Sequence, residues 1–185
     1  MALVVLDPGH GGKDPGAIGR LGEQEASLAY DIALAAKDHL YHLGHETLLT
    51  RGRDEGLGLG ERANIANRRR SDCFVSIHLN SAVNAEAHGF EAYSCPGSMK
   101  GEELRDSILL EIAKEFPDWK NRGGKTAQYV VLRYTKMPAT LVECGFLSHP
   151  EEEKRLLNRE VRNRMGRAIA LGIHSFVKGV QRCTR

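Results

Sequence analysis

The sequence has little of what marks membrane and secreted proteins. No apolar run approaches the ~20 residues that a helix needs to cross a bilayer, so we expect no membrane insertion. The N-terminus has neither a basic region before an apolar stretch nor a cleavage site of small residues, because the segment from Leu3 to Leu6 is already typical of a strand. We therefore expect no signal peptide in this chain.

Cysteine is scarce, and its spacing is not that of a metal-binding or disulfide framework. No two cysteines form a CxxC pair, and Cys73 and Cys144 lie inside apolar, strand-like runs. This distribution argues against a zinc finger and against a disulfide scaffold. It is typical of cysteines that serve as small buried hydrophobic residues. The four cysteines are Cys73, Cys95, Cys144 and Cys183.

An excess of charge of one sign is also lacking. The chain has 26 Lys and Arg residues against 24 Asp and Glu residues, a net charge of +2, so the composition indicates no nucleic-acid partner.

The glycine-rich segment from Gly9 to Gly16 does not complete a nucleotide-binding motif either. A dinucleotide fingerprint needs glycine where Asp14 stands, and a P-loop needs lysine followed by serine or threonine where Ala17 and Ile18 stand.

The pattern of apolar residues predicts alternating helices and strands. Helical spacing begins at Leu28 and stops at Gly44, and several strands are continuous apolar runs, which indicates burial on both faces. We expect an α/β, single-domain, three-layer fold with a mostly parallel, twisted sheet of about six strands flanked by helices. Further helices are predicted at Leu59–Arg69, at Gly101–Glu115, from near Pro150, and from Val161 to Phe176. Strands are predicted at Leu3–Leu6, Glu46–Thr50, Cys73–Ile77, Gly89–Ser94, Tyr129–Leu132 and Ala139–Val142.

No repeat or linker divides the chain. We expect one domain over residues 1–179, followed by a short polar tail over residues 180–185, and we expect the protein to be a monomer. Two connections, Leu79–His88 and Pro117–Thr126, have no clear pattern and are predicted to be loops.

Three residues whose side chains could bind a metal or catalyse a reaction come at the ends of predicted strands. His10 follows the first strand, His78 ends the strand from Cys73, and Glu143 ends the strand from Ala139. The carboxyl ends of parallel strands meet at one edge of a sheet, where α/β proteins bind ligands. Two histidines and acidic residues at that edge suit a divalent metal, zinc above all, with an open position for water. A carboxylate closing an apolar strand is costly to bury unless it is paired or near a metal, which favours a functional role for Glu143.

Four segments carry a resemblance to a known family: Asp7–Gly12 (DPGHGG), Glu23–Leu28 (EQEASL), Ser76–Asn80 (SIHLN) and Met137–Ser148 (MPATLVECGFLS). They resemble the zinc-dependent N-acetylmuramoyl-L-alanine amidases, which cut bacterial peptidoglycan. The resemblance runs in order from about Leu3 to Val177 and so covers nearly the whole chain. Four motifs in the same order are far more specific than any one of them alone.

The resemblance implies a site with one Zn²⁺ per chain. Carried over by position, it makes His10 and His78 zinc ligands, Glu23 the third ligand and Glu143 the catalytic glutamate. The family places its metal-binding glutamate before a short polar stretch that leads into an apolar helix, and this description fits Glu23. Glu25 is the alternative ligand, although by itself it is explained as an acidic residue at a helix N-terminus.

The implied activity is zinc-dependent hydrolysis of the amide bond between N-acetylmuramic acid and L-alanine, with peptidoglycan as the substrate and cell-wall lysis as the result. Two alternatives are a catalytically silent peptidoglycan-binding or regulatory relative, and a zinc peptidase that cuts within the stem peptide. The site of action is then the bacterial cell wall. Without a signal peptide in this chain, this setting fits an endolysin-like enzyme made in the cytoplasm and released by lysis or through a holin, or an excised domain of a secreted autolysin.

Overall fold

A twisted six-stranded sheet forms the centre of the part of the chain that the structure describes. The computed structural model describes residues 1–183, except for the side chains of residues 181–183. The strand order is β2-β1-β3-β6-β4-β5, and neighbouring strands are parallel except for β4 and β6, which are antiparallel. The prediction of a mostly parallel sheet of about six strands is confirmed. The strands are β1 (Leu3–Pro8), β2 (Glu46–Leu49), β3 (Cys73–Asn80), β4 (Phe90–Ser94), β5 (Asn121–Thr126) and β6 (Ala139–Phe146).

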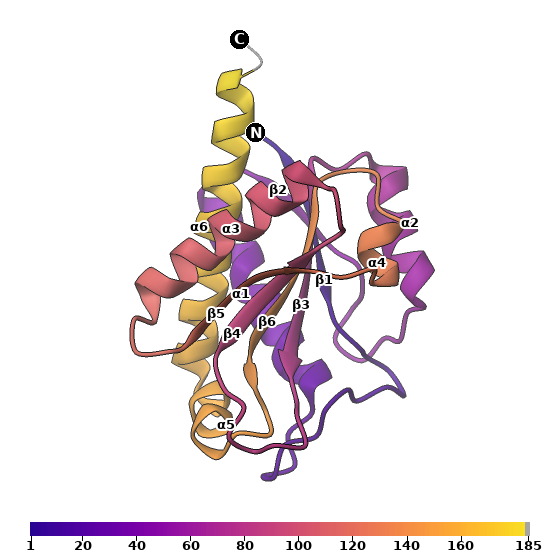
Figure 1. Ribbon diagram of the computed structural model, residues 1–185. Helices are drawn as coiled ribbons and strands as arrows, with labels where there is room; N and C mark the ends of the chain where they lie inside the picture. Colours follow the sequence, from indigo (N-terminus) through magenta and orange to yellow (C-terminus); the bar gives the residue numbers. More distant parts are fainter. Residues whose placement is uncertain (184–185) are drawn as a thin grey trace.

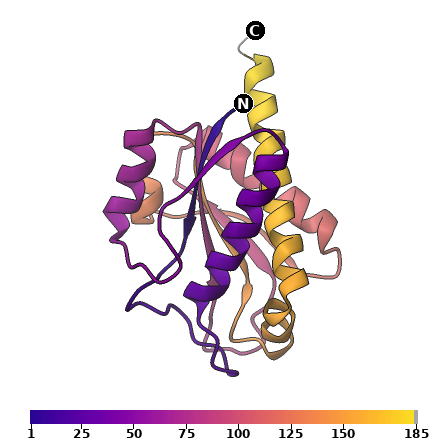
Figure 2. The ribbon, with the colours of Figure 1, turned by 180° about the vertical axis from the view of Figure 1, so that it is seen from behind.

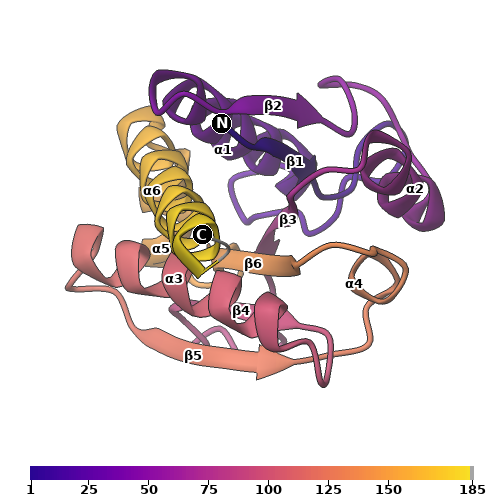
Figure 3. The same cartoon turned by 90° about the horizontal axis from the view of Figure 1, so that it is seen from above.

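Helices cover both faces of the sheet and make the predicted three layers. Seen from above, α1, α3 and α6 lie on one side of the sheet, and α2 and α4 lie on the other (Figure 3). The view from behind shows α1 and α6 packed along each other (Figure 2). The helices are α1 (Glu25–His42), α2 (Leu59–Arg69), α3 (Met99–Glu115), α4 (Val130–Arg133), α5 (Pro150–Leu157) and α6 (Arg159–Cys183).

The two faces of the sheet bury cores of different size. The larger core packs side chains of α1, α3 and α6 against the sheet, with Ile32, Ile108 and Ile169 fully buried. The smaller core packs Ala66 of α2 and Val131 of α4 against the other face. The small helices leave part of that second face open, and the functional residues described below lie on it.

Local sequence signals explain where two helices begin and end. Gly44, just after α1, has a φ of +80°, a conformation that glycine adopts at little cost and that commonly ends a helix. Pro150 is the first residue of α5, where its missing N–H and restricted φ suit a helix start. Three glutamates in that first turn interact favourably with the positive end of the helix dipole.

Two predictions of secondary structure were wrong. The segment Tyr129–Leu132 was predicted as a strand, but Val130–Arg133 forms the short helix α4, because Val131 and Leu132 bury their side chains in the smaller core and not in the sheet. The segment Pro117–Thr126 was predicted as a loop, but it contains the edge strand β5. β5 contains two glycines and no apolar side chain, so the sequence gives no strand signal there, while backbone pairing with β4 forms the strand in the structure.

The C-terminal helix α6 extends to Cys183, beyond the predicted start of a polar tail at residue 180. The remainder of that predicted tail, residues 184–185, lies outside the described residues. Among the helices that the structure describes, none combines the length and the hydropathy that a membrane-spanning segment requires.

Close packing of α6 gives a prediction with an internal control. A Cβ atom added at Gly172 would lie 2.5 Å from the Cα of Ile108 in α3, whereas one added at Gly179 in the same helix would meet nothing within 4 Å. We expect Gly172→Ala to lower the free energy of unfolding by ~1–3 kcal/mol through overpacking. Gly179→Ala should raise it by up to ~1 kcal/mol through helix propensity. Denaturant unfolding of both variants measures this, and equal effects would contradict the packing argument.

Candidate metal centre and active site

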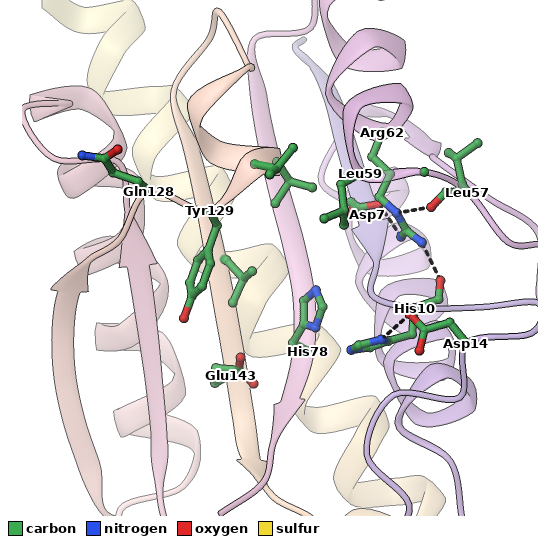
Figure 4. Close-up of a pocket in the computed structure, with 14 residues that line it drawn as sticks. Asp7, His10, Asp14, Leu57, Leu59, Arg62, His78, Gln128, Tyr129 and Glu143 are labelled. Atoms are coloured by element: carbon green, nitrogen blue, oxygen red, sulfur yellow. Dashed lines mark hydrogen bonds and ion pairs between the residues drawn. The ribbon is translucent and has the colours of Figure 1, made fainter.

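The parallel strands bring the predicted site residues to one edge of the sheet. In the β1–β3 pair Pro8 lies opposite Ile77, and in the β3–β6 pair His78 lies opposite Glu143. His10 follows β1 in the loop at the same edge, with a φ of +57° that is uncommon for a residue with a side chain. Figure 4 shows the side chains of His10, His78 and Glu143 around one cleft. The structure therefore brings these three residues together at one edge of the sheet.

Two imidazoles converge on one carboxylate, which belongs to Glu25. Oε1 of Glu25 lies 3.1 Å from Nε2 of His10 and 2.9 Å from Nδ1 of His78. One potential ligand atom from each of the three residues lies within 4.8 Å of the others. The group comes from the loop after β1, the first turn of α1 and the end of β3.

The third member of this group is Glu25, the alternative in the sequence analysis, and not Glu23, which that analysis favoured as the ligand. Glu23 is exposed in the loop before α1, whereas Glu25 is the first residue of that helix and is 4% exposed. Backbone hydrogen bonds from Glu25 to Ala17 and from Ala26 to Pro15 hold the helix start against the histidine loop. A sequence signal was available, because Glu25 continues the buried stripe of Leu28, Ala29 and Ile32 at helical spacing.

Further hydrogen bonds orient the three side chains. Oδ2 of Asp14 lies 2.8 Å from Nδ1 of His10, which leaves Nε2 pointing to the centre of the group. Oε2 of Glu25 accepts a hydrogen bond from the backbone N–H of Ala17, and Oε1 accepts one from that of Leu79. A carboxylate behind a histidine ligand is the usual arrangement at metal sites, where it fixes the ring and raises its basicity.

The electrostatics of the group favour a bound cation. The hydrogen bond to Glu25 raises the pKa of His10 to about 9, so the carboxylate attracts positive charge to this point. Burial raises the pKa of Glu25, but hydrogen bonds from both imidazoles outweigh burial and hold the pKa well below its usual range. Two imidazole nitrogens and one carboxylate oxygen, with a cleft on the open side, match the donor set of a catalytic zinc site.

Glu143 lies beside this group on β6 and lines the same cleft. Its Oε2 atom is buried and has no hydrogen-bond partner. Burial raises the pKa of Glu143 to about 7. A carboxyl group with a pKa near neutrality can both accept and return a proton, as general acid–base catalysis requires.

The cleft has a volume of about 580 Å³ and a mixed lining. His10, Asp14, His78 and Glu143 line it together with apolar residues, which include Leu57, Leu59 and Tyr129. Such a mixture is typical of binding sites, in which apolar walls remove substrate from water and a few polar groups set its orientation.

Two buried arginines hold the histidine loop in place, and the sequence analysis missed both. Arg51 donates hydrogen bonds to the backbone oxygens of Pro8, Gly9 and Ala26, which ties the loop to α1. Arg62 donates to the backbone oxygens of Pro8 and His10 and to the buried carboxylate of Asp7. These bonds explain how His10 is kept at a positive φ.

One glycine of the loop has a steric role. A Cβ atom added at Gly9 would lie 2.3 Å from Cε1 of His78. The absence of a side chain at this position therefore lets the loop approach the second histidine closely.

Comparisons with known proteins show the family of this chain. The profile of the family described as N-acetylmuramoyl-L-alanine amidase matches residues 4–175. The sporulation-specific N-acetylmuramoyl-L-alanine amidase of Bacillus subtilis (strain 168) is 37% identical over 175 residues, which are 94% of this chain and 67% of the relative.

Solved structures match over nearly the whole fold. AmiC2 of Nostoc punctiforme, an N-acetylmuramoyl-L-alanine amidase, is 39% identical with a TM-score of 0.90, and the match covers 97% of each chain. The catalytic domain of CwlV from Bacillus (Paenibacillus) polymyxa var. colistinus is 32% identical with a TM-score of 0.91, covering 96% of this chain and 99% of that one. Together with the family profile, these matches confirm the resemblance seen in the sequence motifs: the chain belongs to the N-acetylmuramoyl-L-alanine amidase family.

Proposed function

We propose that this protein is a zinc-dependent enzyme of the bacterial cell wall that hydrolyses the amide bond between N-acetylmuramic acid and L-alanine in peptidoglycan. The observation that carries the proposal is the convergence of His10, Glu25 and His78 on one point, beside a buried carboxyl oxygen of Glu143 that has no partner. These residues supply a ligand set, an open side and an acid–base group in one cleft.

His10, Glu25 and His78 would hold the zinc ion. When bound, zinc supplies Lewis-acid chemistry, lowering the pKa of water from ~15.7 towards ~7 and stabilising negative charge on the substrate oxygen. Asp14 keeps the ring of His10 oriented towards the centre of the site. The backbone N–H groups of Ala17 and Leu79 keep the carboxylate of Glu25 oriented in the same way.

Glu143 would move the proton. Its carboxylate accepts a proton from the attacking water, and the oxygen of that water bonds to the lactyl carbonyl carbon of the muramic acid. The carbon–nitrogen bond then breaks, and Glu143 returns the proton to the nitrogen of L-alanine. The products are a glycan with a free lactyl carboxylate and a stem peptide with a free amino terminus, so the peptides no longer anchor to the glycan strands and the wall loses strength.

Mass spectrometry of digested muropeptides tests this proposal. We expect the zinc-loaded protein to release intact stem peptides that begin with L-alanine, a chelator to stop the release, and added zinc to restore it. Cleavage between two amino acids would instead identify a zinc peptidase. Binding to peptidoglycan without any release would identify a silent relative.

A further inference from the structure

A second charged cluster lies next to Glu143 on the open face of the sheet. Glu91 of β4 is the antiparallel partner of Glu143, so their side chains project from the same face of neighbouring strands. Glu91 is 2% exposed, and its carboxylate accepts hydrogen bonds from Nε of Arg122 at 2.6 Å and Nζ of Lys125 at 2.5 Å. It also accepts bonds from Nδ2 of Asn80 and the hydroxyl of Tyr93. The mechanism above uses none of these groups.

An irregularity in β5 brings the two cations to the same face. Residues 122 and 125 would point to opposite faces of a regular strand, because side chains alternate. Between the pairs Phe90–Asn121 and Ala92–Gly124, β5 advances by one residue more than β4, which is the geometry of a bulge. Gly123 lies within this bulge with a φ of +81°. The extra residue shifts the alternation, so that Arg122 and Lys125 both reach Glu91.

The cluster has more positive charge than its buried carboxylate requires. One cation would neutralise Glu91, but two are in contact with it, which leaves a net charge of +1. The side chains of Arg122 and Lys125 are 27% and 39% exposed, so both can meet a ligand from solvent. The nearby carboxylate of Asp106 does not neutralise these cations, because it pairs with Arg105. This pair lies next to Gly124, on the other face of the strand from the cluster.

Two tyrosine rings connect the cations to the catalytic cleft. Tyr129 lines the cleft, and its ring centroid lies 5.3 Å from that of Tyr93. Nζ of Lys125 lies 5.7 Å from the centroid of the Tyr93 ring. Figure 1 shows β6, β4 and β5 as successive strands of the sheet. The charged ends of Arg122 and Lys125 reach Glu91 on β4, the strand next to β6 at a spacing of ~4.8 Å. Two residues of an extended peptide span ~7 Å, which is enough to cover that distance.

We infer that Arg122 and Lys125 form a subsite that binds a carboxylate of the stem peptide, beyond the amide bond that Glu143 helps to cleave. This inference rests on the proposed function, since that function places the scissile bond at Glu143. The second residue of a stem peptide is a D-glutamate linked through its γ-carboxyl, so its α-carboxyl is free unless the cell wall amidates it. An extended peptide that crosses β4 brings this group to the two cations, and buried Glu91 holds them in position.

The test uses two soluble N-acetylmuramoyl tripeptides, L-alanyl-γ-D-glutamyl-L-lysine with the α-carboxyl of glutamate either free or amidated. We expect the wild-type protein to prefer the free acid by about 10-fold in kcat/KM, mainly through KM, which corresponds to ~1.4 kcal/mol. Lys125→Gln and Arg122→Gln should each reduce the ratio of kcat/KM for the free acid to kcat/KM for the amidated compound towards one. Each variant leaves Glu91 with one cation, which favours retention of the fold.

Two further variants separate recognition from general effects. Lys125→Arg keeps the positive charge and should keep the preference. Lys114→Gln removes an exposed lysine of α3, which covers the other face of the sheet, and should also keep it. The inference would be overturned if the wild-type protein hydrolysed the two compounds with a kcat/KM ratio near one. It would also be overturned if that ratio were unchanged in both Lys125→Gln and Arg122→Gln.

A binding measurement keeps the inference distinct from the proposed reaction. Isothermal titration of the same two compounds into the Glu143→Gln variant reports recognition without turnover. Tighter binding of the free acid that is lost in the Glu143→Gln, Lys125→Gln double variant would support the subsite even if the wild-type protein hydrolyses neither compound. Hydrolysis of both compounds with equal efficiency, together with equal binding, would support the reaction and reject the subsite.

Discussion

Replacing Glu143 by glutamine is expected to lower kcat for amide hydrolysis by ~10²–10⁴-fold, the usual contribution of a positioned acid–base group. Glutamine has nearly the same shape as glutamate but cannot accept and return a proton near neutral pH. Burial raises the pKa of Glu143 to about 7, so at that pH the wild-type side chain exists in both protonation states. The variant loses this capacity while the rest of the cleft keeps its form.

The control for this variant is its metal content. Glu143 is not among the three residues whose ligand atoms converge, so zinc bound per chain should equal that of the wild-type protein. Elemental analysis measures the zinc, and release of stem peptides measures the rate. If Glu143→Gln retained activity within about threefold of wild type, a margin far inside the expected loss, another group would have to transfer the proton.

The second large effect is expected at Glu25, with Glu23 as a matched control two residues away in the sequence. Glu25→Gln removes the carboxylate on which both histidines converge, and so should weaken zinc binding by more than the ~10–100-fold typical of losing a group that only supports a ligand. Glu23→Gln makes the same chemical change at an exposed position and should leave zinc binding unchanged.

Zinc affinity measured by competition with a chelator compares the two variants directly. Thermal unfolding of the metal-free proteins separates loss of the ligand from loss of the fold, since Glu25 also accepts hydrogen bonds from the backbone of Ala17 and Leu79. Wild-type affinity in Glu25→Gln, or a loss confined to Glu23→Gln, would restore the assignment that the sequence motif favoured.

Some elements could be predicted from local patterns and others could not. The helix α2 begins and ends where helical spacing and the last-turn arginines predict, at Leu59 and Arg69. The edge strand β5 was missed, because it has no apolar side chains to bury and its pairing partners in β4 lie 31 or 32 positions earlier. Such a strand forms through long-range backbone hydrogen bonds, to which local propensity contributes little.

The sequence by itself determined the fold class and the placement of His10, His78 and Glu143 at one sheet edge, because each follows a continuous apolar run of the kind that forms a buried strand. Tertiary structure decided which glutamate joins the histidines, since residues two apart near a helix start do not share a face and the docking of α1 buries Glu25 but not Glu23. It also decided that Arg51 and Arg62 support the histidine loop and that the β5 bulge unites Arg122 and Lys125. These contacts join residues 31 to 52 positions apart, or depend on one added residue in a strand, and local sequence patterns carry no signal of either.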